Sequence, residues 1–236
     1  MGSQSLQELL VTVATPIPKF RNLAELIDRL GGVPLDRIRM NPPPGTATVE
    51  DVVEIEAHED RFCELVDGVL VEKTMGYFES EIAVLLAAAL VQFVRKHDLG
   101  VVTGEGGMIL FPRNQVLIPD IAFAGWNRFP DGEIPDDPVP EIVPDLAVEV
   151  LSASNSTGEM SRKLREYFEA GVRLVWYVDP VAKVVTVYTS QSRSKVVPLD
   201  GTLDGGKVLP GFALPVREIF AFRKPRGTKN GRKGKR

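Results

Sequence analysis

Cysteine and histidine are scarce in this sequence, since its 236 residues include one cysteine and two histidines. A lone Cys63 excludes an internal disulfide framework and a zinc site built from cysteines. His58 and His97 both fall in charged helical segments, which predicts surface positions and argues against a histidine-built metal centre. A single thiol suits a reducing compartment, so we expect a cytoplasmic protein.

Long hydrophobic runs and a signal sequence are also missing. The longest apolar stretch, residues 82–94, is too short to span a bilayer and lies between charged segments. Gln4, Gln7 and Glu8 occupy the place where a secretory signal carries basic residues. Hydrophobic residues make up 44% of the chain, which is enough for a substantial core. We therefore expect a soluble globular protein.

Motifs of two common enzyme classes are absent as well. No G-x-S-x-G pattern occurs, so Ser152, Ser154 and Ser156 are interpreted as loop and cap residues, which argues against a serine hydrolase. The glycine-rich residues 104–108, GEGGM, lack the spacing of a phosphate-binding loop. They predict a β-bulge or a close backbone approach instead.

Charge is distributed unevenly. The net charge is −4, but residues 223–236 hold eight basic residues and no acid. That leaves 20 basic against 32 acidic residues in residues 1–222, a net charge of −12. The basic tail is either a solubilising end or an arm that binds a polyanion, and composition alone does not choose between them.

The chain divides into an N-terminal extension, residues 1–45, a main domain, residues 46–222, and the basic tail. Within the extension, residues 20–32 have the apolar spacing of a short amphipathic helix that ends at two glycines. A second helix is predicted to begin at Thr48. Asp67-Gly68 stands between two β-type runs and predicts a hairpin.

The rest of the chain alternates between helical and β patterns. Residues 75–100 predict a long, mostly buried helix that ends at Gly100, and residues 154–171 a helix that Ser156 and Glu159 would cap and Gly171 would end. The expected strands are residues 101–111, 116–125, 144–152, 172–180 and 183–190, the first two as neighbours, with a loop at 129–144. This order predicts an α/β fold (α+β, with a mixed sheet).

Two acids interrupt strands that otherwise look buried. Asp120 lies in VLIPDIAFAG and Glu149 in PDLAVEVLS. An unpaired carboxylate is costly to bury, and two that lie close together repel each other unless a cation separates them. Mg²⁺ binds carboxylate oxygens at about 2.0–2.1 Å and commonly bridges protein and phosphate. The pair therefore predicts a magnesium site, although an Asp next to a proline is also a common turn residue.

The helix at residues 154–171 adds a positive charge to this prediction. Met160, Leu164, Tyr167 and Phe168 define its inward face, and Lys163 lies at the edge of that face. The charged side chains expected on the other side are Arg162, Arg165, Glu166 and Glu169. Lys163 either extends past the core to solvent or stabilises the negative charge of a phosphoryl-transfer transition state.

Together these motifs resemble the PD-(D/E)XK nuclease superfamily. Pro119-Asp120 and Glu149-Val150-Leu151 match its signature, except that Leu151 replaces the superfamily lysine. A bacterial family of restriction endonucleases shows the same departure, with the lysine in the following helix, where Lys163 stands. The resemblance covers residues 46–221, and its further matches are CELVDGVLVE (63–72), KLREYFEAGVRLVWYVDP (163–180) and GFALPVREIF (211–220).

The resemblance implies a restriction-endonuclease-like core, a mixed sheet flanked by helices. Asp120 and Glu149 would be metal ligands, with the carbonyl of Val150 as a further ligand, and Lys163 would stabilise charge or orient water. Glu79 occupies the position of an acid that often joins such sites, although an acid in the first turn of a helix is ordinary. Glu64 matches a family acid that lines the site, and a cross-strand ion pair would explain it equally well.

We therefore expect a Mg²⁺-dependent DNA endonuclease, with Mn²⁺ able to substitute, that hydrolyses phosphodiester bonds with metal-activated water. A homodimer would supply one site for each DNA strand. The alternative is a non-catalytic descendant of this fold that binds nucleic acid or protein, which the acidic body favours because it would repel DNA at low salt. The joint presence of Asp120, Glu149 and Lys163 favours the enzyme.

Overall fold

The computed structural model describes residues 20–59 and 61–221; the basic tail lies outside these residues. Its helices are α1 (Leu23–Arg29), α2 (Val49–Glu59), α3 (Tyr77–Lys96), α4 (Thr157–Ala170) and α5 (Val216–Ile219), with 3₁₀ turns η1 (Leu35–Arg37) and η2 (Trp126–Arg128). Its strands are β1 (Cys63–Val66), β2 (Val69–Glu72), β3 (Gly100–Thr103), β4 (Ile109–Phe111), β5 (Gln115–Leu117), β6 (Ile121–Gly125), β7 (Leu146–Val150), β8 (Leu174–Asp179), β9 (Val184–Ser190), β10 (Arg193–Val197), β11 (Thr202–Gly205) and β12 (Leu209–Pro215).

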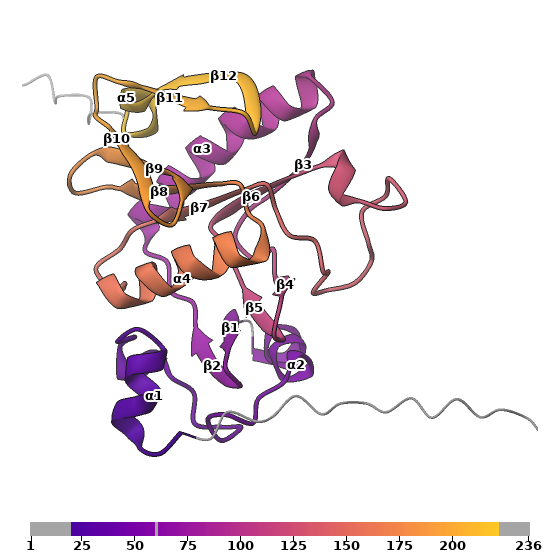
Figure 1. The fold of residues 1–236 in the computed structure, drawn as a ribbon, viewed down its shortest axis with the longest axis vertical. Coiled ribbons are helices and arrows are strands. Elements are labelled where there is room, and N and C mark those ends of the chain that lie inside the picture. The colour runs from indigo at the N-terminus through magenta and orange to yellow at the C-terminus, as the bar shows by residue number, and fades with distance from the viewer. Residues whose placement is uncertain (1–19, 60, 222–236) are drawn as a thin grey trace, which may run out of the picture.

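The described strands form a large sheet, a small sheet and a two-stranded ribbon. The large sheet has the order β10-β9-β8-β7-β6-β3, and only β7 and β8 run parallel in it. The small sheet has the order β2-β1-β5-β4, and β11 pairs with β12. Helices α3 and α4 lie on opposite faces of the large sheet (Figure 1). This mixed sheet flanked by helices confirms the predicted fold class.

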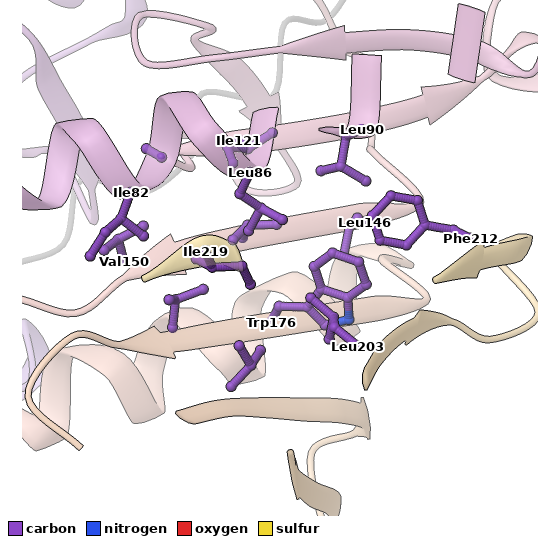
Figure 2. Packing of buried hydrophobic residues seen from close by; sticks show 14 of the residues in the cluster. Ile82, Leu86, Leu90, Ile121, Leu146, Val150, Trp176, Leu203, Phe212 and Ile219 are labelled. Carbon is purple, nitrogen blue, oxygen red and sulfur yellow. The ribbon is translucent and has the colours of Figure 1, made fainter. Parts of the chain in front are cut away.

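The face of the large sheet that α3 covers holds the largest hydrophobic cluster. Ile82, Leu86 and Leu90 recur at helical spacing along α3 and pack against alternate residues of β6, β7 and β8 (Figure 2). Trp176 is fully buried at the centre of this cluster. By length and composition α3 could also cross a membrane, but the core helix of a soluble protein has the same properties.

The other face of the large sheet packs against α4, and α4 in turn packs against the small sheet. Ala122, Ala147 and Val175 share one hydrophobic cluster with Leu164 of α4 and with Val71 of β2. Side chains alternate between the faces of a strand, so every second residue of β6 and β7 points toward α4. This alternation decides which way the two predicted acids point.

The predicted turns and helix ends agree with the structure in most places. Asp67 and Gly68 both have positive φ, as a tight hairpin turn requires. Gly171 ends α4 in the left-handed conformation. Helix α3, however, ends at Lys96 rather than at Gly100, because Asp98 has a φ of 50° and turns the chain into β3.

The expectation that residues 101–111 and 116–125 lie next to each other is confirmed, but neither run is one continuous strand. Each run divides into two short strands that belong to different sheets: β3 pairs with β6 in the large sheet, and β4 with β5 in the small one. Residues 104–108, expected to form a bulge or a close backbone approach, include the turn by which the chain passes between the sheets. Hydrophobic alternation is the same in both sheets, so the sequence pattern does not reveal the switch.

The N-terminal segment packs directly against α4. Leu26, Leu30 and Val33 are buried in the cluster that α4 shares with the small sheet. The backbone of Gly31 approaches that of Gly158 so closely that a Cβ on either glycine would lie 2.4 Å from the other backbone. Residues 20–45 therefore cover part of the side of α4 that the sequence pattern assigned to solvent. Arg162 is buried and donates a hydrogen bond to the carbonyl of Leu30, whereas the side chains of Arg165 and Glu169 stay exposed.

Candidate active site

Asp120 and Glu149 lie opposite each other and line one small cavity. Ile121 of β6 pairs with Val148 of β7, and the same register one residue further places Asp120 opposite Glu149. Opposite residues of antiparallel strands project to the same face, which here is the face toward α4. Both carboxylates are buried, with 4% and 5% of the residue surface exposed.

The cavity that these two acids line has a volume of about 20 Å³, room for one water-sized group. Its wall combines acids and cations from six segments of the chain: Arg37, Glu64, Lys73, Thr74, Met75, Glu79, Asp120, Glu149, Val150, Ser152, Asn155, Glu159 and Lys163. All five residues proposed for the site from the sequence line this one cavity. The chain brings them together across 100 positions of sequence, from Glu64 to Lys163.

Lys163 lies at the centre of the charged groups. Its Nζ atom lies 2.6 Å from Oε1 of Glu149 and 2.8 Å from Oε1 of Glu64. The lysine does not extend to solvent, because only 4% of its surface is exposed. Helix α4 therefore directs this ammonium toward the sheet, as its position at the edge of the inward face predicted.

Glu64 approaches the site from β1 on the small sheet. Its Oε1 accepts a hydrogen bond from the backbone N–H of Ile118 at 3.1 Å, in addition to the contact with Lys163. Its Oε2 is buried and has no hydrogen-bond partner among the described residues. The cross-strand neighbour of Glu64 is Val71, so a cross-strand ion pair does not explain this acid.

Glu79 lies at the rim, in the first turn of α3. It lines both the small cavity and an adjacent cavity of about 590 Å³, which borders the N-terminus of α4 and the end of β8. Among the described residues its side chain forms no hydrogen bond or ion pair. Its carboxylate lies close to Gly76, the residue that precedes α3.

Lys73 is a site residue that sequence reasoning missed. It follows directly after β2, and its Nζ lies 2.7 Å from Oδ1 of Asp120 and also donates a hydrogen bond to the carbonyl of Ile118. The other carboxylate oxygen of Asp120 accepts the N–H of Val150 at 2.6 Å. The alternation of Val69, Val71 and Lys73 places this lysine on the inward face of the strand, and that signal could have found it.

Tyr167 is a second missed residue. Its hydroxyl donates a hydrogen bond to Oε1 of Glu149, the oxygen that also contacts Lys163. The sequence pattern placed Tyr167 on the inward face of α4, and a buried tyrosine hydroxyl generally finds a partner. That rule, applied to the nearest buried acid, would have indicated the contact.

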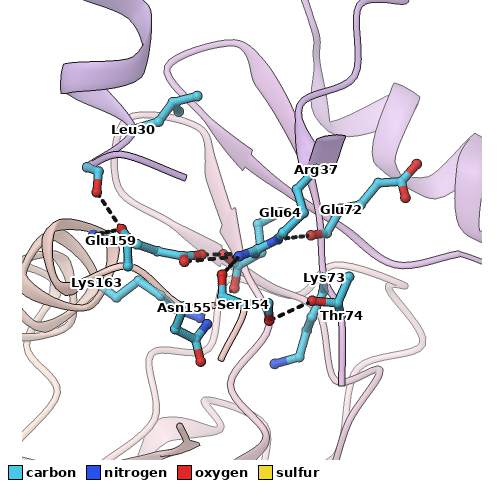
Figure 3. A network of polar contacts seen from close by, with 12 residues as sticks. Leu30, Arg37, Glu64, Glu72, Lys73, Thr74, Ser154, Asn155, Glu159 and Lys163 are labelled. Atoms are coloured by element: carbon cyan, nitrogen blue, oxygen red, sulfur yellow. Dashed lines mark hydrogen bonds and ion pairs between the residues drawn. The ribbon is translucent and has the colours of Figure 1, made fainter. Parts of the chain in front are cut away.

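Arg37, from the N-terminal segment, also lines the cavity (Figure 3). Its guanidinium forms a bidentate pair with Glu159 at 2.9 and 3.0 Å and donates to the carbonyls of Glu72 and Ser154. The predicted capping box is consequently half formed: Ser156 accepts the N–H of Glu159, but the carboxylate of Glu159 binds Arg37. No local sequence signal indicates this pair, because its members are 122 positions apart.

Burial and the mixture of charges shift the pKa values of the site. Burial raises the pKa of Glu149, and the attraction of Lys163 and Lys73 offsets this only in part, since Asp120 and Glu64 repel its charge. Burial also opposes ionisation of Glu64, but Lys163 and Lys73 lower its pKa to about 2. Burial disfavours the charged form of Lys163, yet Glu149 and Glu64 raise its pKa above the ordinary value. Lys163 is therefore positively charged at neutral pH.

The donor atoms around the cavity fit a hard divalent cation. Carboxylate and carbonyl oxygens are the groups that Mg²⁺ prefers, and Oε2 of Glu64 is buried without a hydrogen-bond partner among the described residues. Three buried carboxylates contact only two ammonium groups; the acids are Asp120, Glu64 and Glu149, and the lysines are Lys73 and Lys163. As the described side chains lie, however, no three acids, histidines or cysteines are grouped to hold an ion. Lysine ammonium groups contact Asp120 and Glu149 instead.

Comparisons with known proteins agree with this fold. The sequence profile of a family named Uma2, described as "Putative restriction endonuclease", matches residues 49–217. A crystal structure described as a "putative nuclease belonging to DUF820" from Anabaena variabilis ATCC 29413 superposes with a TM-score of 0.61 and 22% identity. The match covers 68% of this chain and 90% of that chain. The search of curated proteins gave no match.

Proposed function

Because the chain belongs to the Uma2 family of restriction-endonuclease-like proteins, we propose that it is a Mg²⁺-dependent endonuclease that hydrolyses phosphodiester bonds of DNA. The observation that carries the proposal is the placement of Asp120 and Glu149 opposite each other, buried in one cavity beside the charged Lys163. Two acids and a cation converging on one point are the parts that metal-assisted phosphodiester hydrolysis requires.

Asp120 and Glu149 would hold the ion, together with the main-chain carbonyl of Val150, which lines the same cavity. A divalent ion bound there would polarise the phosphate and lower the pKa of a water molecule. The N–H of Val150 fixes Oδ2 of Asp120, and the hydroxyl of Tyr167 fixes Oε1 of Glu149. These two contacts fix the orientation of both carboxylates, while Lys73 contacts the other oxygen of Asp120.

Lys163 would act as a fixed positive charge rather than as a proton donor. Its raised pKa means that it keeps its proton at neutral pH. Glu64 holds it in place from the small sheet, while Glu149 holds it from the large one. An ammonium positioned in advance stabilises the charge that develops on a phosphoryl group in the transition state.

The substrate phosphate would approach from the larger cavity. Glu79, Ser152 and Asn155 line both cavities, so the two adjoin at these residues. We propose that Glu79 holds a second ion or its water at this entrance, since its carboxylate has no partner among the described residues. A homodimer would place two such entrances on the two strands of a duplex.

Cleavage of supercoiled plasmid tests the proposal. Wild type in Mg²⁺ or Mn²⁺ should nick the plasmid, and Asp120→Asn and Glu149→Gln should each reduce the rate about 100-fold or more, the size of effect typical for loss of a group that stabilises transition-state charge. Asp131→Asn, an exposed acid in the loop before β7, is the control and should cleave like wild type.

Two outcomes would contradict the nuclease. Equal nicking by wild type and by the Asp120→Asn/Glu149→Gln double variant would assign the activity to a contaminant or to another site. Binding of DNA by wild type without any cleavage in either metal would instead favour the non-catalytic descendant of the fold. The binding assays need a salt series, because phosphate contacts depend steeply on ionic strength.

A further inference from the structure

Lys73 is a buried charge that the proposed mechanism does not use. Its side chain is 7% exposed, and its ammonium lies 2.7 Å from Oδ1 of Asp120. It donates a second hydrogen bond to the carbonyl of Ile118. Lys163 already supplies a fixed positive charge on the opposite side of the cavity, so the position of Lys73 calls for a separate explanation.

The ammonium of Lys73 occupies the side of Asp120 that a divalent ion would need. Oδ2 of Asp120 is committed to the N–H of Val150, which leaves Oδ1 as the oxygen available to a ligand. That oxygen is the partner of Lys73. Without Lys73, Asp120 would be a buried carboxylate with no charged partner, which is strongly unfavourable. The lysine therefore stabilises the site when no ion is bound and competes with the ion when one arrives.

The backbone at Lys73 is held by hydrogen bonds that do not involve its side chain. Its backbone N–H bonds to the carbonyl of Phe62 at 2.9 Å, and Arg37 holds the preceding carbonyl, that of Glu72, at 2.8 Å. The four methylene groups beyond this fixed backbone are flexible, and the lysine lines the cavity rather than being enclosed behind it. Displacement of Lys73 from Asp120 would therefore require movement of its side chain and not of this backbone.

We infer that Lys73 is a resident counter-ion, which holds the carboxylate of Asp120 in the metal-free protein and which a divalent ion must displace to bind. The inference rests on the proposed metal site. It implies that this chain binds its metal more weakly than the acids alone would, and that the metal-free protein is more stable than the acids alone would allow.

Mn²⁺ titration of the purified full chain, followed by the electron paramagnetic resonance signal of free Mn²⁺, tests the inference. Lys73→Met, which keeps the length of the side chain and removes its charge, should lower the Mn²⁺ dissociation constant about tenfold or more, because a competing charge has left a poorly solvated site. The melting temperature of metal-free Lys73→Met should fall, and saturating Mn²⁺ should raise it by more than it raises that of wild type.

Matched variants make the result specific. Lys195→Met, an exposed lysine on β10, should leave the Mn²⁺ affinity unchanged. Lys73→Arg keeps the charge and should stay near the wild-type affinity. Lys73→Met in an Asp120→Asn background should show no gain. If Lys73→Met does not fold, Lys73→Gln replaces it and should likewise lower the Mn²⁺ dissociation constant.

The outcomes separate this inference from the proposed function. An Mn²⁺ affinity that is equal or weaker in both Lys73→Met and Lys73→Gln, with clear binding by wild type, would overturn the counter-ion role and leave the nuclease proposal standing. A purely structural lysine would give that result, since it would lower the melting temperature without changing the increment due to metal. Absence of Mn²⁺ binding in every variant would overturn the metal site itself.

Discussion

The Nζ atom of Lys163 lies 2.6 Å from Oε1 of Glu149, although the lysine belongs to α4 and the glutamate to the strand that precedes that helix. Both groups are buried, and Glu64 provides the lysine with a second carboxylate. Substitution of this buried lysine should therefore lower both the free energy of unfolding and the cleavage activity.

Lys163→Met should abolish detectable cleavage and lower the free energy of unfolding by about 3–5 kcal/mol, the usual cost of leaving a buried ion pair without one partner. Urea unfolding measures the second effect and plasmid nicking the first. Lys163→Arg keeps the charge and should recover most of the stability. An unfolding free energy of Lys163→Met within about 1 kcal/mol of wild type would mean that the pair is not buried as described.

Substitutions in the bidentate pair of Arg37 and Glu159 should have non-additive effects on the free energy of unfolding. Arg37→Met alone should cost about 3–5 kcal/mol of unfolding free energy because it leaves the carboxylate of Glu159 buried and unpaired. The Arg37→Met/Glu159→Met double variant should be more stable than either single variant, since no charge is then left uncompensated. A double-mutant cycle by urea denaturation gives the coupling, and additive effects would contradict a direct contact.

Gly158→Ala should be destabilising, even though alanine favours a helix over glycine by about 1 kcal/mol. A Cβ at Gly158 would lie 2.4 Å from the carbonyl oxygen of Gly31, which is backbone and cannot move aside. We expect a loss of about 2 kcal/mol in chemical denaturation. Gly104→Ala is the control, because a Cβ there meets no atom within 4 Å. A neutral Gly158→Ala would show that residues 20–45 do not pack against α4 as described.

Asp145 should make stability depend on pH in the acid range. Burial opposes its ionisation, but hydrogen bonds from Arg128 and from the N–H of Gly125 hold its pKa below the ordinary value of 3.8. A lowered pKa contributes stability above the unfolded value, and that contribution is lost as pH falls through the folded one.

The difference in unfolding free energy between wild type and Asp145→Asn should therefore be constant above about pH 5, near 2 kcal/mol, and shrink toward pH 3. Thermal or urea unfolding across this range measures it. Asp200→Asn, an exposed acid, serves as the control. A difference that grows as the pH falls would contradict the assigned direction of the shift.

Local physical chemistry in the sequence was enough to predict the central strand with Glu149, the neighbouring strand with Asp120, and the helix that follows Glu149. Glu149 interrupts an apolar run between Pro144 and a serine-rich turn, and such a run predicts a buried strand whatever surrounds it. The position of Lys163 on its helix follows from a rotation of 100° per residue. The capping serine and the final glycine of α4 are likewise local signals.

The partners of these charges were decided only by the tertiary structure. Lys73 meets Asp120, and Arg37 meets Glu159, because the small sheet and the N-terminal segment pack against α4, and no periodicity records which sheet a short strand will join. An ion pair between distant segments depends on the whole packing arrangement, whereas burial of a strand depends on a few adjacent residues. The sequence alone thus determined that Asp120 and Glu149 would be buried, and the fold determined which cations would neutralise them.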